Sequence, residues 1–335
     1  MKTVKMALIG YGNVGQGFAR MLKRRQDYIK DTYDCEVKIT AICTRSKGAL
    51  IDPNGIDTDN INDADFNKEM TSMQVIDEAD FDLMAELTPI NIKTGQPAID
   101  HIRHALSRGK YVTTANKGPI AWAYRELRDL AKENNVALFY EPTVMDGIPV
   151  YDFARETLKG CKITEIKGIL NATTNFVLEK MANGVSFEDA VKDGQRQGFV
   201  EADPSMDLEG WDAAAKLTAL MNVVMDAHIT PNQIQRQGIS HITKKDIDEA
   251  KADHKKIKLL CHGWIENGQP VGTVSPQLVD EGSLIASIDG TMSSVTMNTD
   301  LMGEVSVIEH AYEPEIDHTA YGVLVDLFFI LEAMK

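Results

Sequence analysis

The glycine-rich run Gly10-Tyr-Gly12-Asn-Val-Gly15 restricts the possible folds of this chain more than any other feature. It follows an apolar run at residues 4–9, typical of a buried parallel strand, and precedes residues 16–29, which have helical character. Glycines at this spacing permit a tight turn and a close backbone approach, and the N-terminus of the following helix offers free N–H groups to a pyrophosphate. The run therefore predicts a dinucleotide-binding turn; the alternative is a turn with a purely structural role.

Strands and helices alternate as far as residue 140. Further strands are expected at residues 37–42, 81–87, 109–114 and 136–140, and helices at residues 96–107 and 124–133. This alternation predicts a Rossmann-like, doubly wound α/β nucleotide-binding domain over residues 1–140, with ligands at the carboxyl ends of its strands. Residues 49–78 are acidic and weakly patterned, and we expect a surface loop with one short helix there.

The pattern changes after residue 140 and predicts a second, α+β catalytic domain with a mixed sheet over residues 141–318. A strand is expected at residues 163–170, helices at 174–183 and 186–198, and a mixture of helix and short strands at 237–310. A largely apolar helix at residues 319–334 is expected to pack back on the first domain, to which we therefore assign residues 319–335.

The second strand is followed by Cys43-Thr-Arg45-Ser-Lys47, where a cofactor with a free ribose 2′-hydroxyl usually meets an acidic residue. Arg45 and Lys47 suit a 2′-phosphate instead, because an arginine fork matches phosphate geometry. The sequence therefore favours NADP over NAD as the cofactor. The alternative is a solvated basic turn.

The run from Glu201 to Lys216 combines several acidic residues, a glycine and a lysine. Asp212 and Lys216 are four residues apart on an expected helix, a spacing that favours an ion pair, and Glu201 and Asp207 can reach the same place from the preceding loop. The helix continues with apolar residues, so a lysine on it needs a partner and a function. This lysine could transfer a proton; the alternative is a surface helix with an ordinary salt bridge.

Composition excludes several classes of partner. The formal net charge of −15 argues against nucleic acid or an anionic membrane. The four cysteines are widely spaced, without a metal-binding or disulfide pattern, which indicates reduced thiols in a cytoplasmic protein. No signal sequence and no apolar stretch long enough for a membrane span is evident. We therefore expect a cytoplasmic protein with a small-molecule partner.

Five motifs together resemble the homoserine dehydrogenase family. They are Gly10-x-Gly12-x-Val14-Gly15, Thr113-Thr-Ala-Asn-Lys117, Glu141-x-Thr-Val144, Asn171-x-Thr173-Thr-Asn175 and Gly198-Phe-Val-Glu201-Ala-Asp-Pro-x-x-Asp207-Leu-x-Gly-x-Asp212-x-x-x-Lys216. The resemblance covers the chain from its first strand to about residue 250. It implies the reversible, NAD(P)H-dependent reduction of L-aspartate 4-semialdehyde to L-homoserine, a step of threonine, methionine and isoleucine biosynthesis, by a homodimer.

The resemblance also implies roles for individual residues. Lys216 would stabilise and protonate the oxygen that gains charge when hydride reaches the aldehyde carbon, with Lys117 as a second cation. The substrate-binding residues would be Glu201, Asp207, Asp212, Thr173 and Gly198. Together with Arg45 and Lys47, the cofactor-binding residues would be Gly10, Gly12, Asn13, Val14, Gly15, Thr88 and Lys117. A monovalent cation such as sodium would bind the backbone carbonyls of Glu141, Val144, Asp146 and Ile148.

Some positions depart from the family pattern. The family has glycine in place of Ala172 and a glycine-richer loop in place of Met145-Asp146. Its late glycine-rich stretch corresponds here to residues 309–318, which are bulky and acidic. The chain ends after the following helix, so we expect no C-terminal regulatory domain and no feedback control through one.

Two other functions remain open at this stage. A paralogue could keep the proton-transfer residues and oxidise another small hydroxy or amino acid, which the altered residues 309–318 suggest. A nucleotide-binding sensor without catalysis is the other. The combination of Glu201, Asp212 and Lys216 argues against a sensor, which has no need of a proton relay.

Overall fold

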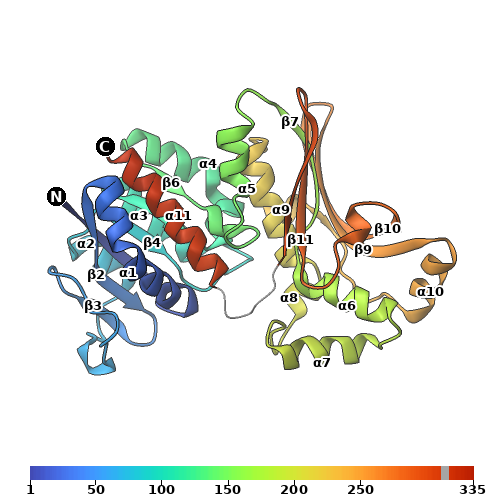
Figure 1. Ribbon diagram of the computed structural model, residues 1–335, viewed down its shortest axis with the longest axis horizontal. Helices are drawn as coiled ribbons and strands as arrows, with labels where there is room; N and C mark the ends of the chain where they lie inside the picture. Colours follow the sequence, from blue (N-terminus) through green and yellow to red (C-terminus); the bar gives the residue numbers. More distant parts are fainter. Residues whose placement is uncertain (311–316) are drawn as a thin grey trace. The chain divides into compact units, whose positions relative to one another are not determined.

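The computed structural model describes residues 1–310 and 317–335, which fall into two compact units. The first unit comprises residues 1–149 together with residues 317–335, and the second comprises residues 150–310. Figure 1 shows that each unit contains one sheet flanked by helices.

The first unit is built on a six-stranded sheet with the order β3-β2-β1-β4-β5-β6. Its strands are β1 (Lys2–Ile9), β2 (Cys35–Thr44), β3 (Gly48–Ile51), β4 (Leu83–Glu86), β5 (Tyr111–Thr114) and β6 (Leu138–Phe139). Its helices are α1 (Asn13–Tyr33), α2 (Ser72–Glu78), α3 (Ala98–Ser107), α4 (Lys117–Glu133) and α11 (His318–Ala333). The strands pair in parallel except β3, which is antiparallel to β2.

Residues on the two faces of β1 belong to two separate cores. Met6 and Leu8 pack in a cluster with residues of α1 and α11, whereas Ala7 and Ile9 pack in a cluster with residues of α2, α3 and α4. Because helices cover both faces, the strands are apolar along their whole length, as parallel strands usually are. The doubly wound α/β fold expected from the sequence is confirmed.

Helix α11 returns the end of the chain to this unit and lies beside α1 (Figure 1). Its Asp326 is fully buried and accepts a hydrogen bond of 2.6 Å from the hydroxyl of Thr113 on β5. The backbone N–H of Glu141 donates to the same carboxylate over 3.4 Å. Residues 141–149 and 317–318, which we expected in the second unit, belong to the first, and the loop after β6 packs on α11.

Three details of the first unit differ from the sequence expectation. Strand β3 was expected to be a loop; it forms because Gly48, with a φ of 84°, turns the chain back along β2. Helix α4 begins at Lys117, well before residue 124, because the side chain of Asn116 caps it by accepting from the N–H of Gly118. Strand β6 contains only two residues.

The second unit contains a mixed six-stranded sheet with the order β12-β11-β7-β9-β10-β8. Its strands are β7 (Ile163–Ile169), β8 (Gln235–Arg236), β9 (Lys255–Glu266), β10 (Gln269–Asp280), β11 (Ser293–Thr299) and β12 (Gly303–Glu309). Its helices are α5 (Val150–Asp152), α6 (Ala172–Ala182), α7 (Phe187–Gln197), α8 (Ser205–Leu208), α9 (Trp211–Val224) and α10 (Lys244–Ala252). Only β8 pairs in parallel, with β10.

Strands β9 and β10 correct the expectation of short strands after residue 237. Each has twelve residues, and Asn267 and Gly268 alone connect them. Both of these residues have positive φ values, 51° and 78°, which is the conformation that a two-residue hairpin turn requires. The Asn-Gly pair was therefore a signal for this hairpin that the sequence interpretation missed.

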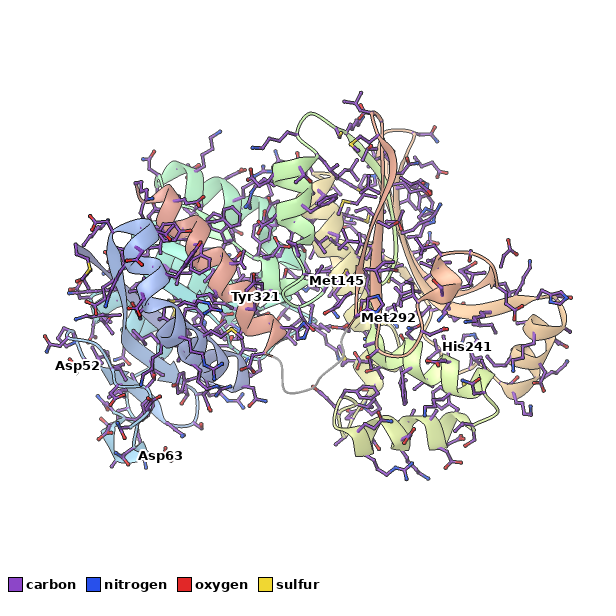
Figure 2. All side chains as sticks on the ribbon, in the orientation of Figure 1. Asp52, Asp63, Met145, His241, Met292 and Tyr321 are labelled. Atoms are coloured by element: carbon purple, nitrogen blue, oxygen red, sulfur yellow. The ribbon has the colours of Figure 1, made fainter. Side chains whose placement is uncertain are left out.

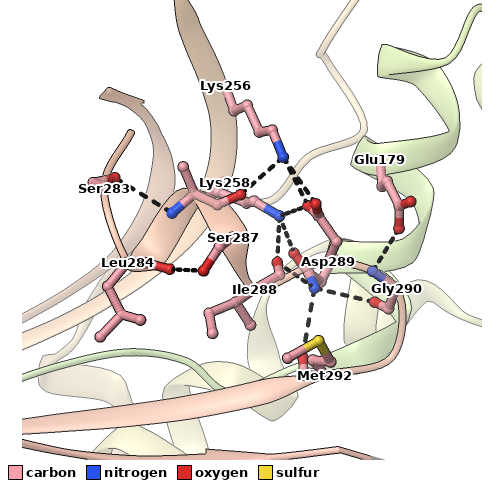
Figure 3. A network of polar contacts seen from close by, with 12 residues as sticks. Glu179, Lys256, Lys258, Ser283, Leu284, Ser287, Ile288, Asp289, Gly290 and Met292 are labelled. Carbon is pink, nitrogen blue, oxygen red and sulfur yellow. Dashed lines mark hydrogen bonds and ion pairs between the residues drawn. The ribbon is translucent and has the colours of Figure 1, made fainter. Parts of the chain in front are cut away.

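A buried lysine joins the sheet of the second unit to α6 and to the loop before β11 (Figure 3). The side chain of Lys258 on β9 is 2% exposed, and its Nζ lies 2.9 Å from Asn175 Oδ1 and 2.8 Å from Asp289 Oδ1. Lys256 forms a second ion pair with Asp289 at 2.8 Å. Burial lowers the pKa of Lys258, while Asp289 opposes that shift. These contacts fix the first turns of α6 against the sheet.

Candidate active site

The glycine turn joins β1 to α1 in the first unit. Gly10 has a φ of 106°, and a Cβ atom there would lie 2.4 Å from the carbonyl oxygen of Leu87. A Cβ atom on Gly15 would lie 2.9 Å from the carbonyl oxygen of Gly10, whereas one on Gly12 would meet nothing within 4 Å. Gly10 and Gly15 are therefore required by the fold, and Gly12 leaves open space in front of the N-terminus of α1.

A cavity of about 960 Å³ lies in front of this turn, entirely within the first unit. The ends of β2 and β4 and the segment at residues 58–72 supply its other walls. The first turn of α1 contains no acidic residue, and the N–H groups of Asn13, Val14 and Gly15 precede the first intrahelical hydrogen bond, from Gln16 to Gly12. The residues present fit a dinucleotide whose pyrophosphate lies at this helix terminus.

Arg45 and Lys47 both line this cavity, but their surroundings differ. The Nζ atom of Lys47 lies 2.7 Å from the Oδ1 atom of Asp63, which Figure 2 labels on the segment between β3 and α2. Arg45 is exposed and has no ion pair among the described residues. Arg45 is therefore better placed than Lys47 to bind a phosphate group.

The carboxyl ends of β4 and β5 bring Thr88 close to the start of α4. The amide nitrogen of Asn116 donates to the carbonyl oxygen of Thr88 over 3.1 Å, while its oxygen caps α4. Lys117 is the first residue of that helix and is half-buried. Thr88 and Lys117 are thus placed at the sheet edge where α/β domains bind ligands.

In the second unit, a compact polar cluster surrounds Lys216. Its Nζ atom lies 3.2 Å from Asp212 Oδ2, one turn earlier on α9, and donates to the carbonyl oxygen of Leu170 at the end of β7 over 2.9 Å. The hydroxyl of Thr173 donates to Asp207 Oδ2 over 2.9 Å. The ion pair expected from the spacing is present, and Asp207 belongs to the same cluster.

Asn171 connects the two carboxylates of this cluster. Its Nδ2 atom donates to Asp207 Oδ1 over 2.8 Å and to Asp212 Oδ2 over 3.0 Å, and its Oδ1 atom caps α6 by accepting from the N–H of Thr174. The sequence interpretation gave Asn171 no role. Its position directly before a helix was the available signal, because asparagine is a preferred N-cap.

The two carboxylates influence each other electrostatically. Burial raises the pKa of Asp207, and the nearby charge of Asp212 raises it further. Hydrogen bonds from Thr173 and Asn171 act in the opposite direction without cancelling these effects. The cluster is therefore a concentration of negative charge next to one ammonium, suited to a ligand that carries an ammonium or hydroxyl group.

The structure does not bring Glu201 and Gly198 into this hydrogen-bonded cluster. Both are exposed and lie on the connection between α7 and α8. The backbone carbonyl of Glu201 accepts from the side chain of Gln195 over 3.1 Å, and Gly198 ends α7 with a φ of 86°.

Comparison with known proteins relates both units to one family. A family model described as the homoserine dehydrogenase NAD-binding domain matches residues 10–141, and one described as homoserine dehydrogenase matches residues 149–328. This chain belongs to the homoserine dehydrogenase family. Members of this family are NAD(P)-dependent oxidoreductases acting on CH–OH groups. The two matches confirm the fold and the family resemblance expected from the sequence.

Individual relatives of the homoserine dehydrogenase family match nearly the whole chain. A homoserine dehydrogenase of Methanocaldococcus jannaschii is 38% identical over 98% of both chains, and an NAD(+)-dependent homoserine dehydrogenase of Pseudomonas canavaninivorans is 35% identical over 98% of this chain and 97% of its own. The crystal structure of a putative homoserine dehydrogenase from Archaeoglobus fulgidus has a TM-score of 0.84 at 31% identity and covers 98% of this chain and 99% of its own.

At two of the positions where the chain departs from the homoserine dehydrogenase pattern, the backbone conformation itself favours glycine. Met145 and Asp146 adopt φ values of 54° and 50°, which glycine adopts more readily, and the hydroxyl of Thr319 donates to the Asp146 side chain over 3.0 Å. Ala172 is the first residue of α6. Of the altered stretch at residues 309–318, residues 311–316 lie outside the described part of the chain.

The described residues show neither a metal-binding cluster nor a membrane-spanning helix. Residues 1–310 and 317–335 contain no group of three or more His, Cys, Asp or Glu side chains arranged to hold a metal ion. Within the same ranges, no helix has the length and apolar character that crossing a membrane requires.

Proposed function

We propose that this protein catalyses the reversible, NAD(P)-dependent reduction of L-aspartate 4-semialdehyde to L-homoserine in the cytoplasm, as a step of threonine, methionine and isoleucine biosynthesis. The observation that carries the proposal is the cluster in which Lys216 contacts Asp212 beside Asp207. Membership of the homoserine dehydrogenase family supports it.

The ammonium of Lys216 is suited to the oxygen chemistry of this reaction. The bound nicotinamide supplies or accepts the hydride. During reduction the carbonyl oxygen gains negative charge, which a nearby ammonium stabilises and then protonates. Asp212 and the carbonyl oxygen of Leu170 hold the lysine amine in position, at 3.2 Å and 2.9 Å.

The acidic residues around Lys216 are suited to an amino-acid substrate. Asp207 and Asp212 can bind its ammonium group, since a charge-assisted hydrogen bond is stronger than a neutral one. Thr173 lines the same place through its hydrogen bond to Asp207. We also assign Glu201 and Gly198 to substrate binding; their place in the family motif supports this, and the exposed Glu201 can turn towards a bound ligand.

The first unit would hold the cofactor. Gly10, Gly12, Asn13, Val14 and Gly15 would bind its pyrophosphate, and Thr88 would contact the cofactor at the end of β4. We propose Lys117 as a second cation at this sheet edge, where it can stabilise charge on the substrate.

We propose NADP as the preferred cofactor, bound at its 2′-phosphate mainly by Arg45 with Lys47 in support. The exposed guanidinium of Arg45 and the absence of an acidic residue at the end of β2 support this choice. Relatives point both ways: a hyperthermophilic archaeal homoserine dehydrogenase, 26% identical with a TM-score of 0.80, was solved with NADPH, and the Pseudomonas canavaninivorans relative is named NAD(+)-dependent.

We also propose a monovalent cation such as sodium at the loop after β6, on the backbone carbonyls of Glu141, Val144, Asp146 and Ile148. Positive φ values at two neighbouring residues, Met145 and Asp146, turn the chain sharply there, and backbone carbonyl oxygens are typical ligands of hard cations. Thermal unfolding with NaCl and with tetramethylammonium chloride at equal ionic strength tests this site, since only sodium should stabilise the protein.

We propose that the protein is a homodimer. Leu260, His262 and Trp264 occupy alternate positions on β9, so they share one face of the second sheet, and all three are only half-buried. His262 stacks on Trp264 with 4.4 Å between the ring centroids. Such a partly apolar face suits a second copy of the chain. Light scattering of Trp264→Glu should show monomers if this face forms the dimer.

The experiment that tests the function is steady-state oxidation of L-homoserine with NADP and with NAD, measured as reduced-nicotinamide absorbance. Activity with homoserine and a higher kcat/KM with NADP support the proposal. A protein that binds the nucleotide, is inactive with homoserine and oxidises another small hydroxy acid would instead be a family paralogue.

A further inference from the structure

One buried carboxylate organises three polar residues behind the wall of the cofactor cavity. Glu86, at the end of β4, is completely buried, and its Oε1 atom is hydrogen-bonded to the hydroxyl of Thr88 and, over 3.3 Å, to Nδ1 of His101. The Nε2 atom of His101 lies 2.7 Å from the hydroxyl of Ser72. Ser72, Thr88 and His101 all line the cavity, whereas Glu86 lies behind them.

The carboxylate gives these hydrogen bonds a direction. An ionised carboxylate can only accept, so the Thr88 hydroxyl and the Nδ1–H group of His101 must donate to Glu86. A neutral His101 then has an unprotonated Nε2 atom, which accepts from the hydroxyl of Ser72. The hydroxyl groups of Thr88 and Ser72 have thereby used their only hydrogens, and these hydroxyls present only lone pairs to the cavity.

A second observation supports a role for this acceptor character. The other carboxylate oxygen of Glu86, Oε2, is buried and has no hydrogen-bond partner among the described residues. Unpaired buried polar atoms are rare in native proteins and cost stability. A glutamine at this position could satisfy the same neighbours. It could also donate to His101, and the hydrogen bonds from Ser72 through His101 to this side chain would then lose their fixed direction.

The position of Ser72 indicates which part of the ligand this wall meets. Ser72 ends the segment at residues 58–72, which lines the cavity next to the end of β2, where the adenosine half of a dinucleotide lies. Hydroxyl groups that can only accept hydrogen bonds repel phosphate oxygens and attract hydroxyl and amino groups. The N-terminus of α1 and Arg45 line other walls of the same cavity.

We propose that the chain Ser72–His101–Glu86 binds a hydrogen-bond donor on the adenosine half of the cofactor, the exocyclic amino group of adenine or a ribose hydroxyl, with Glu86 as the positioning residue. This inference rests on the proposed function only in taking an adenine dinucleotide as the occupant. It adds recognition of adenosine to the phosphate contacts of the glycine turn.

The test compares binding of NADPH with binding of its hypoxanthine analogue, in which a carbonyl oxygen replaces the amino group. Fluorescence titration gives the Kd of both for the wild-type protein, for Glu86→Gln and for the control Asp77→Asn, an exposed carboxylate on α2 that does not line the cavity. The wild type should bind the adenine compound at least tenfold more tightly, because the analogue brings two acceptors together. In Glu86→Gln that ratio should approach one, whereas in Asp77→Asn it should stay at the wild-type value.

A second arm identifies a ribose hydroxyl as the donor. If the wild type does not distinguish the two bases but binds 3′-deoxy-ADP at least tenfold more weakly than ADP, and Glu86→Gln removes that difference, the donor is on the ribose. Equal affinities in both comparisons, or ratios that Glu86→Gln leaves unchanged, would overturn the proposal. Because binding is measured without turnover, failure here is distinguishable from failure to oxidise homoserine.

Discussion

The side chains of Lys216 and Asp212 form an ion pair one helical turn apart on α9, with 3.2 Å between Nζ and Oδ2. Both are largely buried, with 22% and 13% of their side-chain surface exposed. An ordinary surface pair at this spacing contributes a few tenths of a kcal/mol and has no further role. Here Asn171 links the pair to Asp207, so the pair is part of a larger polar site.

Two glycines of the same motif should respond differently to alanine. Gly12→Ala should leave the thermal midpoint of unfolding within a degree or two and weaken NADPH binding at least tenfold, because its Cβ atom meets only the open cavity. Gly10→Ala should unfold at a clearly lower temperature, because its Cβ atom would overlap the carbonyl of Leu87 at a positive φ. Calorimetry and fluorescence titration check both, and a destabilised Gly12→Ala would contradict the structure.

The cofactor preference should depend more on Arg45 than on Lys47. Arg45→Ala should weaken NADPH at least tenfold more than NADH, whereas Lys47→Ala should have a smaller effect because Asp63 already pairs with that lysine at 2.7 Å. Asp63→Asn should strengthen NADPH binding by releasing Lys47. Equal losses of NADPH and NADH in Arg45→Ala would refute a contact with the 2′-phosphate.

The raised pKa of Asp207 predicts a pH-dependent stability. Because folding favours the protonated form, the contribution of this group is fully present below its usual pKa of 3.8 and is lost as pH rises through the higher folded value. From pH 4 to pH 7, the urea midpoint of Asp207→Asn should therefore rise relative to that of the wild type. A shift in the other direction would mean that folding lowers this pKa.

Removing the buried ammonium of the second unit should destabilise it. Lys258→Met removes the ammonium that Asn175 Oδ1 contacts at 2.9 Å and one of the two ammonium partners of Asp289, and should lower the free energy of unfolding by about 2–4 kcal/mol. The control Lys244→Met removes an exposed pair with Asp248 and should change stability by less than about 0.5 kcal/mol. Similar urea midpoints for the two variants would show that the network contributes little.

The sequence predicted the features that depend on local spacing. The glycine turn and the pairing of Asp212 with Lys216 each require only residues within one turn or one helix. The long hairpin of β9 and β10 was also encoded locally, in Asn267-Gly268, but the signal was not used.

Other features depend on residues brought together from distant parts of the chain. Asn171 and Asp212 are 41 positions apart, and Ser72 and His101 are 29 apart, so no spacing rule could join them. The basic turn at Arg45 was found, but the pairing of Lys47 with Asp63 required the fold of residues 58–72. The identities of the residues and their order along the chain indicated the chemistry of the site. The burial of each side chain and its hydrogen-bond partners came only from the structure.

The most direct experiment compares three proteins: the wild type, Lys216→Met and Lys216→Arg. For each, the kcat for oxidation of L-homoserine and the Kd for NADPH are measured. We expect the wild type to be active and Lys216→Met to lose at least a thousandfold in kcat with its NADPH affinity unchanged, because the lysine acts on the substrate oxygen and lies outside the cofactor cavity. Lys216→Arg should recover only part of the activity, since arginine keeps the charge but does not release its proton. A Lys216→Met variant with wild-type kcat would contradict the assignment of this lysine and, with it, the proposed mechanism.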